Sequence, residues 1–407
     1  MKELRKKVPR TSFAHWEPAP DREDPLELLH RTEAGRIAEL LTLRHQRMRA
    51  DVFAFYRGGA ALMAADLAGH PVTGLRVQLG GDAHLMNYGG YATPERNLIF
   101  DVNDFDETLP GPWEWDVARL CASAPLLAQV RDFGKRAGED AAYEAARAYR
   151  RYMRALARRS PLDIWYAHVD VRGMLARELT PPRDATHVKP APQHEDVARG
   201  TLAAYRKTLS PYVRSVLERY HPVDFFEHPV GVGSVGLLTI IAKFEARENE
   251  TLYLQIKEAQ ASVLEPYLGA SAYGNHGERV IMGQHYMQAA SDLFVGWTRE
   301  NGHDFYVRQL RDGKASLDLE RISAEQMVDY ARRCGAVLAR AHARTGDPQA
   351  IAAYLGSGDA FEAGMTRFAR VYAEQVARDY ARFCDRVGDT ANQAEEAGSP
   401  PGPVAQR

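Results

Sequence analysis

The chain has 407 residues, of which 45% are hydrophobic and 26% are charged. This length predicts two lobes or two domains, and this composition is typical of a soluble globular protein. The formal net charge of −2 gives no electrostatic basis for binding nucleic acid or a membrane surface. Three widely spaced cysteines, the lack of a long apolar run and the lack of a signal-peptide core in residues 1–8 predict a cytoplasmic location. No feature of the composition indicates an oligomeric state.

The first half of the chain is predicted to be mainly helical. Three prolines and mixed charge within residues 1–24 indicate an extended arm. Apolar residues at helical spacing follow from about residue 28 to 67. Further on we expect short strands at 75–79 and 97–102, and helices at 115–129, 138–160 and 196–220. Residues 25–225 are therefore expected to form the first part of a helical lobe.

The pattern becomes β-rich after about residue 226. Leu237–Phe244 and Thr251–Lys257 flank a polar turn, which predicts a β-hairpin. The segments expected next are a helix at 278–293, a strand at 304–310, and helices at 324–343 and 361–387. This order predicts a β-rich lobe at 226–321, the final helices of the helical lobe at 322–388, and a disordered tail at 389–407.

Two acidic segments near the N-terminus, 81–89 and 101–107, predict a phosphoryl-transfer site. In enzymes of the kinase type, one Asp orients the nucleophile, while an Asn and a second Asp hold magnesium. The first role is assigned to Asp82, and the metal contacts are assigned to Asn87, Asp104 and Asp106. The structural alternative is that acidic turn residues cap helices and satisfy the loop backbone.

A glycine-rich loop and a strand lysine in the second half predict a nucleotide-binding lobe. The loop residues are Gly231, Gly233, Ser234 and Gly236. A dinucleotide-binding fold would need a helix after the glycines, whereas Leu237–Phe244 is strand-like. A strand, a glycine turn and two further strands, the last with a lysine, form the nucleotide lobe of a kinase. Lys257 would then neutralise the α- and β-phosphates. The alternative is a tight hairpin with a lysine that reaches solvent.

The partner of Lys257 is expected on the following helix. Glu278 is assigned to this role, with Gln284 and Gln288 as rivals. Gln255 lies two residues before the lysine on the same strand face, where kinases usually have a small apolar residue over adenine.

Several other polar residues carry weaker signals. Arginine accounts for 43 of the 52 basic residues, so most arginines are expected to be solvated or structural. Arg57 and Arg308 could nevertheless contact phosphate. His84 is expected to support its loop by hydrogen bonding, and Asp116 to brace a loop near the start of a helix.

At these residues the chain resembles the aminoglycoside phosphotransferase and choline kinase branch of the protein-kinase-like superfamily. The matching motifs are Gly81–Asn87, Asp104-Phe105-Asp106 and Gly111–Ala118. Gly80 stands where a His commonly precedes the loop in that branch, so the role of that His does not carry over.

Over nearly its whole length the chain is also similar to an uncharacterised bacterial family of unknown function, domain-of-unknown-function family 2252. The matching segments are Phe53–Gly58, Asn103–Pro112, Val230–Gly236 and Ala339–Arg344. This resemblance implies a kinase-like fold and no established substrate.

The resemblance implies an α+β, protein-kinase-like two-lobed fold in which the order of the segments along the chain is circularly permuted. The acid cluster and the helical lobe come first, the nucleotide lobe is inserted later, and the helix that normally precedes the catalytic loop comes last. We expect that last helix at Asp329–Arg344, with His342 on it. Cuts at exposed loops leave core contacts intact, which makes such a permutation physically acceptable. This fold requires Lys257 and Asp104 to face each other across one cleft.

The function expected from these features is phosphoryl transfer from ATP, with Mg²⁺, to an unknown acceptor that is expected to be a small molecule. One alternative is a nucleotidyl transferase that uses the same parts. A second is a metallophosphoesterase, for which Asp82-Ala83-His84 and Gly274-Asn275-His276 resemble metal-binding motifs. A third is a non-catalytic nucleotide-binding pseudokinase that binds a partner.

Overall fold

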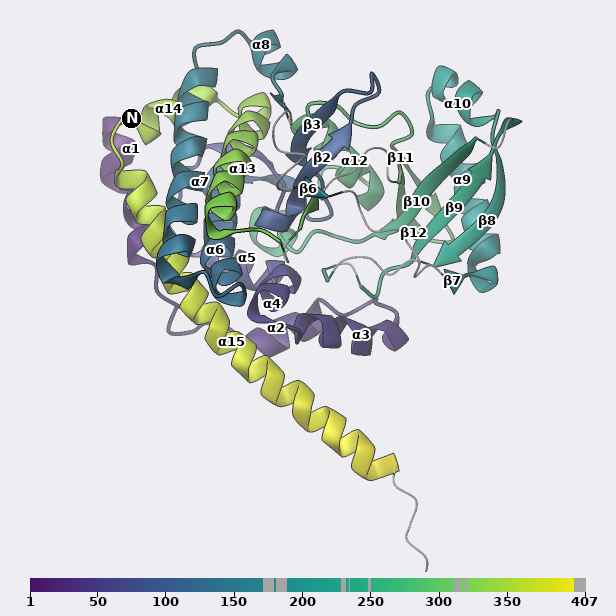
Figure 1. The fold of residues 1–407 in the computed structure, drawn as a ribbon, viewed down its shortest axis with the longest axis horizontal. Helices are drawn as coiled ribbons and strands as arrows, with labels where there is room; N and C mark the ends of the chain where they lie inside the picture. The colour runs from purple at the N-terminus through teal and green to yellow at the C-terminus, as the bar shows by residue number, and fades with distance from the viewer. Residues whose placement is uncertain are drawn as a thin grey trace, which may run out of the picture.

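The computed structural model describes residues 1–170, 179–180, 189–227, 232–233, 235–247, 250–310, 316–318 and 321–398. Gly231 and Ser234, two residues of the predicted glycine loop, lie outside these ranges. The protein is an α+β protein, as expected, in which a helical bundle lies beside an antiparallel sheet (Figure 1).

The elements are named in chain order. The helices are α1 Lys2–Lys7, α2 Pro25–Arg31, α3 Ala38–Met48, α4 Val52–Gly58, α5 Ala60–Ala68, α6 Trp113–Val130, α7 Gly134–Leu156, α8 Pro161–Tyr166, α9 Glu195–Thr208, α10 Pro211–Leu217, α11 Glu265–Leu268, α12 His276–Met287, α13 Ala324–Thr345, α14 Pro348–Leu355 and α15 Ala360–Gly398. The strands are β1 Arg76–Leu79, β2 Tyr88–Ala92, β3 Leu98–Val102, β4 Leu109–Pro112, β5 Val169–Asp170, β6 Leu179–Thr180, β7 Lys189–Pro190, β8 His221–Glu227, β9 Thr239–Glu245, β10 Thr251–Ala259, β11 Gly296–Glu300, β12 His303–Gln309 and β13 Ser316–Leu317.

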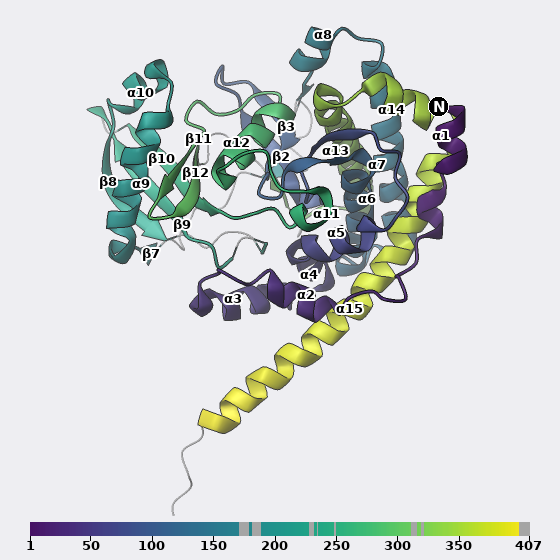
Figure 2. The ribbon, with the colours of Figure 1, turned by 180° about the vertical axis from the view of Figure 1, so that it is seen from behind.

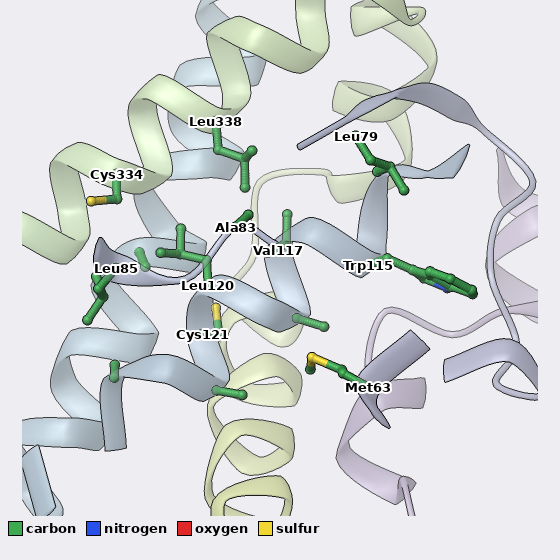
Figure 3. Close-up of a cluster of buried hydrophobic side chains, with 14 of the residues drawn as sticks. Met63, Leu79, Ala83, Leu85, Trp115, Val117, Leu120, Cys121, Cys334 and Leu338 are labelled. Atoms are coloured by element: carbon green, nitrogen blue, oxygen red, sulfur yellow. The ribbon is translucent and has the colours of Figure 1, made fainter. Parts of the chain in front are cut away.

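The larger hydrophobic core lies within the helical bundle. Helix α6 is buried along most of its length because α7, α13 and α15 pack around it. Leu120 and Cys121 of α6 lie close to Cys334 and Leu338 of α13, and Ala83 and Leu85 of the first acidic segment belong to the same cluster (Figure 3). The first acidic segment is therefore anchored in the bundle core.

The β-rich part is a six-stranded antiparallel sheet with the order β11-β12-β10-β9-β8-β7. Strands β9 and β10 form the predicted hairpin, in which Lys257 lies opposite Thr239. On its other edge β10 pairs with β12, so that Lys257 lies opposite Tyr306. A second hydrophobic core joins this sheet to α9 and α10, while α12 contacts β10, β11 and β12.

Two short pairs of antiparallel strands connect the acidic segments. β1 pairs with β4, and β2 pairs with β3 in a register that sets Tyr88 opposite Val102. Because the side-chain pattern of a ladder is fixed by its register, the residues just before β2 and just after β3 lie next to each other.

Some boundaries differ from those expected. The arm is docked on the bundle, because Phe13 and Trp16 are buried against Phe368 of α15. The sheet core begins with Ala198 of α9, earlier than the expected lobe boundary at 226. The region 28–67, where helical apolar spacing was expected, is divided into four short helices, α2 to α5.

Helix α12 and the C-terminal helix also differ from their predicted lengths. α12 ends at Met287 rather than at 293, because Gln288 donates to the carbonyl of Val102 and the N–H of Ala289 donates to Asp101. α15 continues to Gly398, past the expected end at 387, so the first part of the predicted disordered tail is helical (Figure 2). Alanine and glutamate residues that favour helix, and the lack of a proline before Pro400, account for this extension. The rest of the predicted tail, 399–407, lies outside the described residues. Among the described residues, no helix has both the length and the apolar character needed to span a membrane.

Candidate functional site

A cavity of about 360 Å³ lies between the helical bundle and the sheet. The predicted site residues that line it are Asp82, Asn87, Asp104, Asp106 and Gly233. They come from both acidic segments and from the glycine loop, so segments about 130 residues apart in the chain meet here. Lys257 reaches the same cluster through Asp106.

Asp82 is held by Arg119, which was not predicted from the sequence. Arg119 of α6 donates from Nε to Oδ1 of Asp82 at 2.8 Å, and its Nη2 lies 2.6 Å from the same oxygen in an ion pair. Arg119 also donates to the carbonyl of Tyr56 and stacks on that ring at 3.9 Å. The second carboxylate oxygen, Oδ2, lies 3.5 Å from Nε2 of His84 and accepts no hydrogen bond within the described part of the chain. The carboxylate is therefore oriented through one oxygen, and its other oxygen remains available to a ligand.

Asn87 and Asp104 are neighbours because of the β2–β3 ladder. The N–H of Asn103 donates to the carbonyl of Asn87 at 3.0 Å. The side-chain amide of Asn87 donates to the carbonyl of Asp82 at 2.7 Å, which turns its Nδ2 atom away and leaves Oδ1 as an acceptor for a ligand. This bond also ties the two ends of the first acidic segment together.

Lys257 is buried and paired with Asp106. The lysine ammonium donates to one oxygen of Asp106, and the hydroxyl of Tyr306 donates to the other at 2.7 Å. Burial opposes the charged ammonium, but Asp106, with smaller contributions from Tyr306 and Asp104, outweighs it, and together they raise the pKa of Lys257. Burial would likewise raise the pKa of Asp106, but the charge and hydrogen bond of Lys257 hold this pKa below its ordinary value. The pair is therefore charged.

The prediction that Glu278 pairs with Lys257 is wrong, and so are the alternatives Gln284 and Gln288. The lysine bonds Asp106, whereas Gln284 and Gln288 hydrogen-bond to each other at 2.9 Å. Glu278 lies in the first turn of α12, where its backbone N–H is capped by the side chain of Asn275. The acidic segment already supplies a carboxylate next to the lysine, so a partner on α12 is not needed.

Asp104 is a carboxylate for which the described part of the chain provides no bonded cation. Its Oδ1 accepts the backbone N–H of Asp106 at 3.1 Å, and it forms no ion pair within the described ranges. Burial and the neighbouring charge of Asp106 raise the pKa of Asp104 above its ordinary value, although Lys257 and Arg308 act in the opposite direction. Charge on this group is thus incompletely compensated within the protein, which favours a cationic ligand.

Arg308 and Gln255 form a polar wall beside this cluster. Arg308 donates to the side chain of Gln255 at 2.9 Å and to the carbonyl of Asn103 at 3.2 Å. Gln255 is buried, so this face of β10 carries a satisfied polar pair. The contact also fixes the backbone directly before Asp104.

The described part of the glycine loop is bound by Arg44 of α3 and by Arg36 in the segment before α3. Arg44 donates to the carbonyls of Val232 and Gly233, at 2.9 and 2.7 Å, and Arg36 donates to that of Val235 at 2.6 Å. Gly236 has φ of +99°, a conformation that favours glycine. The loop is therefore fixed against α3 and the segment before it.

Asp116 braces the first acidic segment, as expected from the sequence. Its two carboxylate oxygens accept the backbone N–H groups of Gly80 and Gly81, at 2.7 and 3.0 Å. His342 of α13 lies 3.1 Å from one of these oxygens, and its other ring nitrogen lies 2.9 Å from the hydroxyl of Tyr149. Helix α13, which was predicted at 324–343, thus supports the loop that starts the site.

His84 is buried beside Asp82, and this burial predicts that the free energy of unfolding depends on pH. Burial lowers the pKa of His84 to about 3, with Asp82 acting against this shift and Arg57 and Arg119 adding to it. The unfolded chain takes up a proton at this residue near pH 6.5, so stability is lost as the pH falls below that value. Between pH 7.5 and pH 5 we expect wild type to lose about 2 kcal/mol more stability than His84→Gln in urea titrations.

The control for this prediction is the same substitution at an exposed histidine. His221 begins β8 at the surface, and His221→Gln should keep the wild-type dependence of stability on pH. Equal pH dependence in wild type and His84→Gln would contradict the assignment of His84 as a neutral buried group.

The motif Gly274-Asn275-His276 lies at the start of α12. The side chain of Asn275 caps α12 and also donates to Asp304 at 2.9 Å. These residues do not line the cavity. In the described ranges, no group of three or more His, Cys, Asp or Glu side chains is arranged to hold a metal ion.

The fold and the cavity together define an α+β protein with an acidic cleft between a helical bundle and an antiparallel sheet. The chain matches the model of a family described as an uncharacterised protein conserved in bacteria (DUF2252), over residues 36–186 and 175–386. The protein belongs to this family, which confirms the family expected from the sequence. No curated protein and no solved structure matches the chain.

Proposed function

We propose that the protein is a phosphotransferase of the kinase-like type, which transfers the γ-phosphoryl group of ATP to a small-molecule hydroxyl. The observation that carries this proposal is the meeting of Asp82, Asn87, Asp104 and the Lys257–Asp106 pair around one cavity. These are the residue types that kinase-type transfer requires, and they come from separate lobes.

The connectivity around the cavity supports a kinase-like nucleotide lobe. Strands β8, β9 and the lysine strand β10 lie side by side in the sheet, and the glycine-rich segment stands between β8 and β9 in sequence. The short helix α11 follows, and then α12, which packs on β10 and β12. This is the order of strand, glycine turn, strand, strand with lysine and helix that defines such a lobe.

A circular permutation accounts for the position of the acid cluster before this lobe. Helix α13 follows the sheet in sequence, yet it contacts β1 and β3 of the first acidic region. Its His342 bonds Asp116, and its Arg340 forms a buried ion pair with Asp101 of β3. In an unpermuted kinase order, a helix with these contacts would lead directly into the catalytic loop.

The residues present fit a magnesium ion. Asp104 has no bonded cation among the described residues, and Oδ1 of the adjacent Asn87 is free. Mg²⁺ in such sites takes one or two protein carboxylates and completes its shell with phosphates and water. Asp104 and Asn87 would hold the ion, with Asp106 nearby, and the ion would neutralise charge on the phosphates of ATP.

The chain's own residues supply positioning and charge. Arg119 orients the carboxylate of Asp82, whose Oδ2 takes the proton of the acceptor hydroxyl. The hydroxyl oxygen forms a bond to the γ-phosphorus, and the bond from that phosphorus to the bridging oxygen breaks. Its electron pair stays on ADP. Lys257 stabilises the negative charge of the phosphates that remain.

The test of this proposal is turnover by Asp82→Asn. Wild type with Mg²⁺ and radiolabelled ATP is incubated with pools of hydroxyl-bearing metabolites, and label transfer is measured. Because Asn cannot accept the proton, we expect at least about a 100-fold loss of transfer, with ATP affinity within about threefold of wild type.

The matched control is Asp163→Asn, a carboxylate in the exposed helix α8, which should leave transfer unchanged. Full transfer by Asp82→Asn would contradict the assigned role.

A further inference from the structure

Arg57 is a cavity-lining cation for which the described part of the chain provides no hydrogen-bond or ion-pair partner. It lies near the end of α4, and its Nε atom is buried and forms no hydrogen bond among the described residues. The other two arginines of the cavity are occupied: Arg31 pairs with Glu23 at 2.6 Å, and Arg36 donates to two backbone carbonyls. A buried Nε–H group without an acceptor is costly, and a ligand anion would supply an acceptor for it.

Arg57 lies on the side of the cavity where transfer would occur. The carboxylates that act most strongly on it are Asp82, Asp51 and Asp104. Asp51 is occupied as the N-cap of α4, where it accepts the N–H of Ala54 at 2.7 Å. Asp82 and Asp104 are the proposed proton acceptor and metal ligand, so a group between them would meet Arg57.

The position of Arg57 is fixed from both sides of the cavity. The preceding carbonyl, of Tyr56, accepts from Arg119, which also holds Asp82. The following carbonyl, of Gly58, accepts from Arg44, which also holds Gly233 of the glycine loop. Helix α4 thus connects the first acidic segment to the glycine loop, with Arg57 between the two contacts.

We infer that Arg57 is a catalytic residue that binds the γ-phosphoryl group of the nucleotide during its transfer. This inference rests on the proposed function. The guanidinium donates to the equatorial oxygens of the phosphoryl group as it moves from ADP to the acceptor oxygen, by the bond changes given above. It stabilises the charge of that group and forms or breaks no covalent bond.

The test compares Mg·ATP and Mg·ADP in calorimetric titrations of the full chain. For Arg57→Gln we expect ATP affinity to fall at least about tenfold and ADP affinity to change less than about threefold. Arg57→Lys keeps the charge without the fork of donors, so its ATP affinity should lie between those of wild type and Arg57→Gln. Arg332→Gln, at the half-exposed surface of α13 and outside the cavity lining, is the control, and it should bind both nucleotides as wild type does.

Two different outcomes would overturn the inference. If wild type binds both nucleotides but Arg57→Gln weakens ATP and ADP equally, or weakens neither, the inference is wrong and the proposed function stands. If wild type binds neither nucleotide, the proposed function is wrong and the inference falls with it. Should Arg57→Gln fail to fold, as judged by circular dichroism, the same comparison is made with Arg57→Lys, for which equal effects on ATP and ADP would overturn the inference.

Discussion

Arg340→Met is expected to lower the free energy of unfolding by about 3–5 kcal/mol. Arg340 and Asp101 form an ion pair in which both side chains are only 1% exposed. Removing the arginine leaves the Asp101 carboxylate buried, and the donors that remain to it among the described residues are the backbone N–H groups of Val102 and Ala289. An uncompensated buried charge is strongly destabilising, whereas the methionine side chain fills much of the vacated space. Urea denaturation measures the loss.

The matched control for this prediction is Arg332→Met on the same helix. Arg332 pairs with Asp329 at the surface, where both side chains are about half exposed, so the same substitution should change stability little. Similar effects of the two substitutions would contradict the view that α13 is bound to β3 through a buried charge pair.

Lys257→Met is expected to destabilise the protein by a similar amount, about 3–5 kcal/mol, and to abolish nucleotide binding. The lysine side chain is 2% exposed, and its removal leaves Asp106 with the hydroxyl of Tyr306 as its side-chain donor. The double variant Lys257→Met/Asp106→Asn removes the uncompensated charge as well, so it should recover much of the stability and none of the binding. Urea denaturation and nucleotide titration separate the two effects.

Lys243→Met on the neighbouring strand β9 is the control. Lys243 bonds the partly exposed Glu245 at 2.6 Å, and its loss should change neither stability nor nucleotide binding appreciably. If the double variant is less stable than Lys257→Met, the cost arises from lost packing rather than from the unpaired carboxylate.

The elements around the site were largely predictable from local pattern. The period-two run before Lys257 predicted β10, and the short apolar run before Asp101–Glu107 predicted β3. Strand β2 was missed because Tyr88–Ala92 contains two glycines, which lower strand propensity, and its pairing with β3 offsets that loss. Strand β8 was missed because it contains Pro222 and is mostly exposed, and β11 because it is short and begins with Gly296.

The partners of the site residues were much less predictable. Asp82, Asn87 and Asp104 were named from their spacing, but Arg119 lies 37 residues from Asp82 and has no distinguishing local pattern. Lys257 was expected to pair with the next helix, and its partner instead lies 151 residues earlier. Such contacts depend on how the elements pack, and one sequence does not specify that packing locally. With 43 arginines, a single structural arginine could not be recognised in advance.

The central claim is that the cavity between the bundle and the sheet binds a nucleotide for phosphoryl transfer. The measurement that tests it most directly is the thermal unfolding of wild type and Lys257→Met with Mg²⁺ and increasing ATP. We predict that ATP at 100 times its dissociation constant stabilises wild type by about 2.7 kcal/mol and does not stabilise Lys257→Met. No stabilisation of wild type by Mg·ATP, or equal stabilisation of the two proteins, would contradict the claim.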